Sequence, residues 1–99
     1  MNDRKALEFE WDKGNTGKNK KHKVEDFESE EPFFDPCKVT LKDSPHSETE
    51  ERHILLGKTK KGRLLFIVFT ERAGKVRIIS ARQINKKEVP LYEKTAKNT

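Results

Sequence analysis

Apolar residues are gathered in a few short segments, and polar stretches separate these segments. Residues 7–11, 37–41 and 75–82 alternate apolar and polar positions, which predicts strands with one buried face. Residues 63–71 (RLLFIVFTE) carry bulky apolar side chains on both faces, which predicts a central strand covered on both sides. Residues 52–59 predict the strand that precedes it.

Short polar sequences connect these segments. Residues 59–62 (TKKG) predict a turn before the central strand, and residues 72–74 (RAG) predict a hairpin turn after it. Residues 42–51 combine turn-forming residues with acids, which indicates an exposed loop.

One helix is predicted before the second strand. Apolar side chains recur at roughly helical intervals in residues 24–34, so we expect a helix that begins at Glu25 or Asp26 and ends or bends at Pro32. The preceding residues 12–23 contain no apolar side chain, which favours a loop or a poor, all-polar helix.

A second helix is predicted near the C-terminus. Asn85 and Glu88 have the spacing of a capping box, and Pro90 predicts that this helix is bent or short. Residues 94–99 form a polar tail. The order of elements predicts an α+β fold, a small and mainly antiparallel sheet flanked by helices, in one domain over residues 1–99.

The charge of the chain indicates which kinds of molecule it can bind. Of 99 residues, 31% are hydrophobic and 39% are charged, and 22 Lys and Arg against 17 Asp and Glu give a net charge of +5 and a pI near 9.4. This surplus favours a polyanion, either a nucleic acid or an acidic protein. The single cysteine, Cys37, excludes an intramolecular disulfide and suits a reducing compartment. No apolar run is long enough for a bilayer and no signal peptide is recognised, so a cytoplasmic protein without a membrane partner is expected.

The hairpin carries most of the candidate chemistry. If Ala73 and Gly74 form its tip, the opposed pairs are Arg72 with Lys75, Thr70 with Arg77, and Val68 with Ile79. One face then carries Arg72, Lys75 and Arg77, while Arg63 and Arg82 are expected on the opposite face at the other end. Either local carboxylates neutralise these cations, or they bind phosphate, for which the planar guanidinium is well suited.

Longer stretches of the chain bear on this choice. FEWDKGNTGKN, KKHKV, EEPFFD, HSETEERHILLGKT, GRLLFIVFTERAGKVRIISAR and NKKE…YE occur in the order found in BrnT-family toxins, from about residue 9 to residue 93. The chain therefore resembles a BrnT-like toxin of a type II toxin–antitoxin system.

The resemblance implies a RelE-like fold and a metal-independent endoribonuclease, in which the RNA 2′-hydroxyl attacks the adjacent phosphate. It implies no cofactor and no metal. It also implies a BrnA-like ribbon-helix-helix antitoxin, binding of operator DNA only through that antitoxin, and a heterotetramer of two toxins and two antitoxins.

The resemblance also assigns roles to residues. His22, in KKHKV, is the expected acid or base, and the adjacent lysines favour its neutral form; an ordinary surface histidine is the alternative. The catalytic candidates are His22, Arg72, Arg77 and Arg82. The RNA-binding candidates are Lys18, Lys21, Arg63 and Lys75. His46 and His53 lack the companion ligands of a metal site.

Two other functions fit the same residues. The KNKKH spacing is one residue shorter than is usual in the family, and Pro32 and Pro90 replace helix-compatible residues. A degenerate toxin that only binds nucleic acid, or only binds its antitoxin, therefore stays open.

Overall fold

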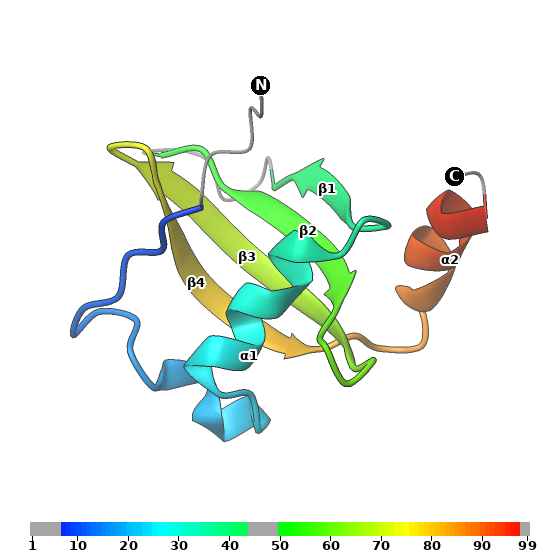
Figure 1. Cartoon of the computed structure of the whole chain (residues 1–99), viewed down its shortest axis with the longest axis horizontal. Coiled ribbons are helices and arrows are strands. Elements are labelled where there is room, and N and C mark those ends of the chain that lie inside the picture. Colours follow the sequence, from blue (N-terminus) through cyan, green and yellow to red (C-terminus); the bar gives the residue numbers. More distant parts are fainter. Residues whose placement is uncertain (1–6, 44–49, 98–99) are drawn as a thin grey trace.

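The computed structural model describes residues 7–43 and 50–97. Four strands and two α-helices form an α+β domain, with two 3-10 turns before the first strand (Figure 1). In chain order the elements are η1 (Lys18–His22), α1 (Asp26–Glu30), η2 (Glu31–Phe34), β1 (Val39–Lys42), β2 (His53–Lys58), β3 (Leu64–Arg72), β4 (Lys75–Gln83) and α2 (Val89–Lys97).

The strands form one antiparallel sheet in the order β1-β2-β3-β4. The predicted hairpin is confirmed, since Arg72 pairs with Lys75 and Thr70 with Arg77. Ala73 (φ 49°) and Gly74 (φ 80°) both lie in the left-handed region, as a two-residue turn between twisted strands requires.

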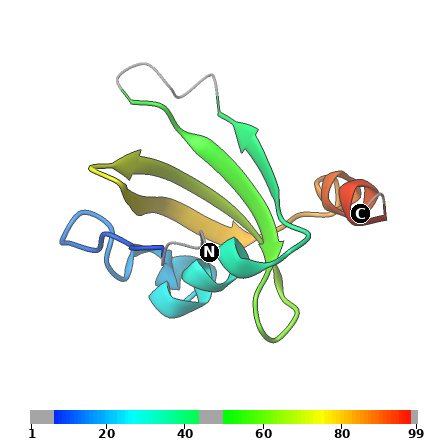
Figure 2. The same ribbon diagram turned by 45° about the horizontal axis from the view of Figure 1, so that its top comes forward.

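One face of the sheet holds the core. Leu65, Ile67 and Phe69 of β3 are buried there. The turn η2 contacts β2, η1 contacts β4, and α1 contacts η2. Figure 2 shows α1 below the sheet and no helix above it within the part of the chain that the structure describes. The full core cluster is Val24, Phe33, Leu55, Leu65, Ile67, Phe69, Val76, Ile78 and Ala81.

The second face of β3 is only half-covered, so the prediction of a strand buried on both sides is wrong. Leu64, Phe66 and Val68 on this face are half-buried. Helix α2 contacts β1 and stands beyond this edge strand instead of crossing the sheet (Figures 1 and 2). The two short helices do not cover both apolar faces of β3. Neither described helix is long and apolar enough to span a membrane.

A β-bulge corrects the expected facing of Arg82. Val68 pairs with Ser80 and Phe69 pairs with Ile78, which leaves Ile79 without a partner. The expected Val68–Ile79 pair is therefore wrong. The extra residue shifts the alternation by one, so Arg82, opposite Phe66, lies on the same face as Arg77 and not on the opposite one.

The N-terminal segment is extended but does not form the predicted strand. Phe9 makes an isolated parallel bridge to Val76, supported by backbone hydrogen bonds from Glu10 N to Val76 O (2.7 Å) and from Val76 N to Glu8 O (2.8 Å). Phe9 and Trp11 pack against the core, as the alternation of this segment suggests. The segment therefore covers part of the free edge of β4.

Helix α1 begins where it was predicted. Glu25 is its N-cap, in a capping box with Glu28, and Pro32 changes the helix into the 3-10 turn η2. The C-terminal helix begins later than the predicted capping box implies. Asn85 and Glu88 form a reciprocal hydrogen-bonded turn, and α2 starts after this turn at Val89, with Pro90 in its first turn.

Candidate nucleic-acid interface

The half-covered face carries cations at both ends of the β3–β4 hairpin. Arg72, Lys75 and Arg77 lie near the turn, and Arg82 lies at the other end. Arg82 follows Arg77 by five positions along β4, which corresponds to roughly 15 Å in a strand. The two guanidinium groups are therefore held at separate places along the strand, Arg77 at Asp12 and Arg82 at Glu88.

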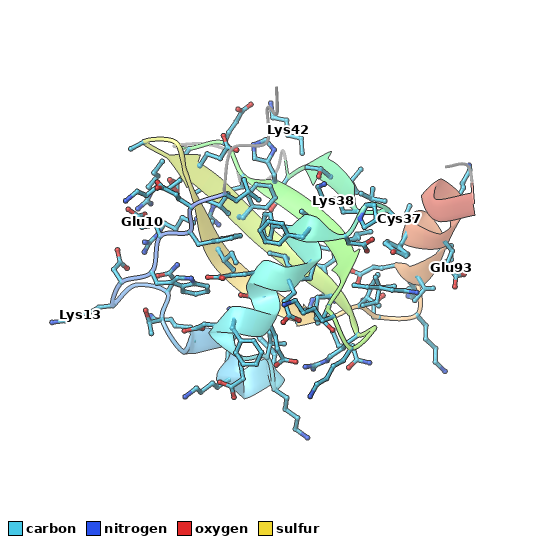
Figure 3. All side chains as sticks on the ribbon, in the orientation of Figure 1. Glu10, Lys13, Cys37, Lys38, Lys42 and Glu93 are labelled. Atoms are coloured by element: carbon cyan, nitrogen blue, oxygen red, sulfur yellow. The ribbon has the colours of Figure 1, made fainter. Side chains whose placement is uncertain are left out.

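Arg77 is held tightly by the N-terminal segment. Its Nη1 donates to Asp12 Oδ2 (2.9 Å) and Glu10 Oε1 (3.2 Å), and its Nη2 donates to Asp12 Oδ1 (2.9 Å). Figure 3 shows Glu10 on the segment beside β4. The side chain of Arg77 is 11% exposed. Hydrogen bonding to Arg77 lowers the pKa of Asp12, so this carboxylate stays ionised and the pair is locked.

Gly14 lets the following turn close over the Arg77 guanidinium. A Cβ at Gly14 would stand 2.5 Å from Arg77 Nη2. The turn is fixed by the buried Asn15, whose Nδ2 donates to the carbonyls of Glu10 (2.9 Å) and Ile78 (3.0 Å). Gly14 thus allows this turn to pack closely on Arg77 of β4.

Arg72 and Lys75 stand side by side at the hairpin end. Arg72 donates from Nε (3.1 Å) and Nη2 (3.2 Å) to the carboxylate of Glu50, and about half of its side chain is exposed. Lys75 is exposed and forms no ion pair with any residue the structure describes. At this end of the hairpin, Lys75 can therefore bind an anion directly, whereas Arg72 is already paired with one carboxylate.

Arg82 is fixed by an aromatic ring and a carboxylate. Its guanidinium carbon lies 4.1 Å from the centre of the Phe66 ring. Nη1 and Nη2 donate to Glu88 Oε1 (2.9 Å) and Oε2 (2.8 Å). Hydrogen bonding with Arg82 lowers the pKa of Glu88, so the pair is charged at neutral pH. With 36% of its side chain exposed, Arg82 stays reachable from solvent.

Arg63 lies on the core side and organises the lysine-rich turn η1. Nη1 donates to the carbonyl of Lys23 (2.7 Å), and Nη2 donates more weakly to the carbonyl of His22 (3.4 Å). Nε donates to Gln83 Oε1 (3.3 Å), and Nη1 stands 3.6 Å from Glu28. Its donors are directed at the protein, so it positions η1 more than it presents a charge.

The turn η1 presents the predicted His22 with Lys18 and Lys21. These three side chains are exposed, and none makes an ion pair within the described ranges 7–43 and 50–97. Gly17 (φ 70°) and Lys23 (φ 61°) frame the turn. Asn19 anchors it, because its Oδ1 accepts the buried backbone N–H of Ala81 (2.9 Å).

At the C-terminal end of β4, a chain of hydrogen bonds links Arg82 on the half-covered face, through Gln83 and Arg63 on the core side, to the main chain of η1. Gln83 accepts a hydrogen bond from Arg63 at its side chain and one from Arg82 at its carbonyl (3.2 Å), and Arg63 in turn holds η1 with His22. Arg72, Lys75 and Arg77 belong to the other end. This arrangement can hold phosphates at two separate places along one strand.

Local sequence patterns do not reveal two contacts of Arg82. The spacing of Glu88 predicts a helix cap and the run that contains Phe66 predicts a buried strand, but the bulge brings Arg82 to both residues. Tyr92 packs with 5% exposure and donates to Asp35 Oδ2 (2.7 Å). His53 stacks on Phe69, and His46 lies outside the described residues.

The sequence was also compared with known proteins. No curated protein matches it. The family described as "Ribonuclease toxin, BrnT, of type II toxin-antitoxin system" matches residues 11–88, which is most of the chain and includes η1, the sheet and Glu88. The chain therefore belongs to the BrnT family of ribonuclease toxins of type II toxin–antitoxin systems.

Proposed function

We propose that this toxin is a RelE-like, metal-independent endoribonuclease whose reaction is an internal transfer of phosphate. The RNA 2′-oxygen forms a bond to the adjacent phosphorus, and the bond from phosphorus to the 5′-oxygen breaks. The 2′-proton goes to a protein base and the 5′-oxygen takes a proton from water. The products are a 2′,3′-cyclic phosphate and a free 5′-hydroxyl.

The proposal rests on Arg82 and on its contacts with Phe66 and Glu88. The pentavalent phosphorane gains negative charge, and a guanidinium held in fixed geometry stabilises that charge without reorganising. Arg82 is held in that way, between the Phe66 ring and the Glu88 carboxylate, at the edge of a half-covered face.

His22 is proposed as the base that takes the 2′-proton. Arg63 and Gln83 connect the main-chain carbonyl of His22 to the guanidinium of Arg82, around the C-terminal end of β4. The exposed Lys18 and Lys21 would then bind phosphates beside the broken linkage, and Arg63 would fix the turn that carries them. Arg72, Lys75 and Arg77 would bind RNA farther along the strand.

A cleavage assay in EDTA tests the chemistry. The purified, antitoxin-free protein should cut RNA in EDTA and leave 2′,3′-cyclic phosphate ends, which mass spectrometry of the fragments identifies. Arg82→Ala should lower the cleavage rate by about 100-fold or more, the usual loss for one electrostatic donor. Arg82→Lys should recover part of it, because an ammonium keeps the charge but loses the two-pronged fork.

Lys38→Ala is the matched control. Lys38 is an exposed cation beside β1 (Figure 3), and its loss should leave the rate unchanged. Intact RNA after incubation with the folded wild-type protein, or equal rates for Arg82→Ala and wild type, would remove the proposal.

A second candidate function has its own observation. Arg63, Arg72, Arg77 and Arg82 each already contact a carboxylate within 4 Å. A degenerate toxin that binds RNA or its antitoxin without cutting is consistent with such occupied cations. It predicts salt-sensitive RNA binding, with a slope of about −0.7 per phosphate contact on single strands, and no cleavage products.

The type II family implies an antitoxin. We propose that this antitoxin is BrnA-like, that it carries a ribbon-helix-helix part through which the complex binds operator DNA, and that two toxins and two antitoxins assemble in the cytoplasm. Light scattering of the complex, co-expressed with the product of the neighbouring reading frame, measures the stoichiometry.

A further inference from the structure

The helical layer of this basic protein is strongly acidic. Residues 24–37 contain six Asp and Glu and no Lys or Arg, although the whole chain carries +5. The six acids are Glu25, Asp26, Glu28, Glu30, Glu31 and Asp35. They lie on α1, on η2 and at the ends of these elements, and we call this region the acidic layer.

Neutral donors, and not cations, satisfy most of these carboxylates. Asp26 accepts the backbone N–H of Gly17, Glu30 accepts the indole N–H of Trp11 (2.6 Å), and Glu31 accepts the backbone N–H of Lys60 (3.0 Å). Neutral donors orient a carboxylate but leave its charge in place. Among the described residues, one ion pair reaches the acidic layer, the 3.6 Å contact of Glu28 with Arg63.

Asp35 shows that the charge persists even where a side chain is partly enclosed. Burial opposes its ionisation, but hydrogen bonds from the Tyr92 hydroxyl and from the backbone N–H groups of Lys58 and Cys37 outweigh burial and lower its pKa. The acidic layer therefore keeps a net negative charge at neutral pH.

Two aromatic side chains stand out of the same layer. Phe27 and Phe34 are each 63% exposed, which is unusual for side chains of this size. They border a mainly apolar pocket of about 730 Å³. Its lining residues are Phe27, Glu30, Glu31, Phe34, Asp35, Pro36, Lys58, Thr59 and Lys60. The Lys58 ammonium is directed to the Tyr92 ring, 5.8 Å from its centre.

We propose that this pocket is where the antitoxin docks, through an amphipathic segment that places aliphatic side chains between Phe27 and Phe34 and Lys or Arg side chains on the acidic layer. An apolar centre surrounded by charge is the usual anatomy of a protein interface. RNA is disfavoured here, because its phosphates would face several uncompensated carboxylates. The inference rests on the antitoxin that the family implies and not on the proposed cleavage chemistry.

The pocket lies near the lysine-rich turn η1 of the candidate nucleic-acid interface, but the two sites are separate. Glu28 of α1 contacts Arg63, and Arg63 holds the carbonyls of the lysine-rich turn. A segment docked on α1 thus lies next to η1 and can extend toward it. The pocket residues themselves make no contact with Arg82, so their substitution should leave catalysis intact.

Calorimetric titration of the toxin with the purified antitoxin tests the proposal. Phe27→Ala should weaken binding at least tenfold, as truncation of a central aromatic anchor does. Phe27→Lys should weaken it further by repelling the basic segment, and added salt should weaken wild-type binding. The control is Leu41→Ala, which removes an apolar side chain that is 40% exposed on the sheet, outside the pocket.

Each outcome decides the matter. Binding of Phe27→Ala and Phe27→Lys within twofold of wild type overturns the proposal, as does a loss of affinity in Leu41→Ala alone, which would move the interface to the sheet. Loss of RNA cleavage by a folded Phe27→Ala would assign the pocket to RNA. Retained cleavage together with lost antitoxin binding supports the proposal, whereas absence of cleavage in all variants removes only the proposed chemistry.

Discussion

Gly57 of β2 lies directly against Pro32 of η2. A Cβ on Gly57 would stand 2.8 Å from the carbonyl oxygen of Pro32 and 2.9 Å from its Cβ. This close approach of two backbones places η2 on the sheet, and it brings the neighbouring Phe33 into edge contact with Phe69 at 5.0 Å between ring centres. The position of the helical layer on the sheet thus depends on the absence of a side chain at Gly57.

Gly57→Ala should destabilise the fold by about 1–3 kcal/mol, because the added methyl meets main-chain atoms that cannot turn away. The midpoint of urea unfolding measures the change. Gly62→Ala is a useful comparison, since a Cβ there meets nothing within 4 Å and only the positive φ of 85° opposes it. A larger loss in Gly62→Ala than in Gly57→Ala would contradict this account.

Tyr92→Phe should lower the free energy of unfolding by about 1 kcal/mol, the usual net value of one hydrogen bond. The hydroxyl of Tyr92 joins α2 to Asp35, which precedes β1. Hydrogen exchange should show faster opening of α2 in the variant. Unchanged exchange there would mean that packing alone holds the helix.

Stability should fall in acid. Asp35 and Glu88 have pKa values below their ordinary values of 3.8 and 4.5, so their contributions are present above those values and are lost as the pH falls through the folded-state pKa. Thermal melts between pH 6 and pH 2.5 should show this decline, and Glu88→Gln should flatten it. A melting temperature that rises in acid would be incompatible with both pairs.

Arg77 and Arg82 should have separable effects on cleavage. Because they lie at opposite ends of β4, Arg77→Ala should raise KM while kcat changes by less than about tenfold, and Arg82→Ala should lower kcat. Arg77→Ala also leaves Asp12 and Glu10 without their cation, so its fold must be checked by circular dichroism. Equal losses of kcat in both variants would place both groups at one phosphate.

Local sequence patterns predict much of this fold. Alternation located β1 and β4, the helical spacing of apolar residues after Glu25 or Asp26 located α1, and the RAG turn located the hairpin, because each depends on neighbours along the chain. His22 and the hairpin cations were found by resemblance and by charge.

The rest depends on contacts between distant segments. Nothing in the alternation of residues 75–82 marks Ile79 as unpaired, so the facing of Arg82 was predicted wrongly. The carboxylates of Asp12 and Glu50 stand 65 and 22 residues from the arginines they hold, a distance that no local pattern spans. Nor does a polar run reveal that Asn19 is buried at 2% exposure against β4.

The unpaired Ile79 has a consequence for the register of the hairpin. If Ile79 entered the ladder opposite Val68, each later residue of β4 would move one place along β3, and Arg82 would come to lie opposite the buried Leu65 instead of Phe66. The guanidinium would then be driven into the apolar interior, and the methyl of Ala81 would face outward. Removal of Ile79, by contrast, would keep Arg82 opposite Phe66, so a regular ladder that retains all nine residues of β4 is the arrangement that this fold has to avoid.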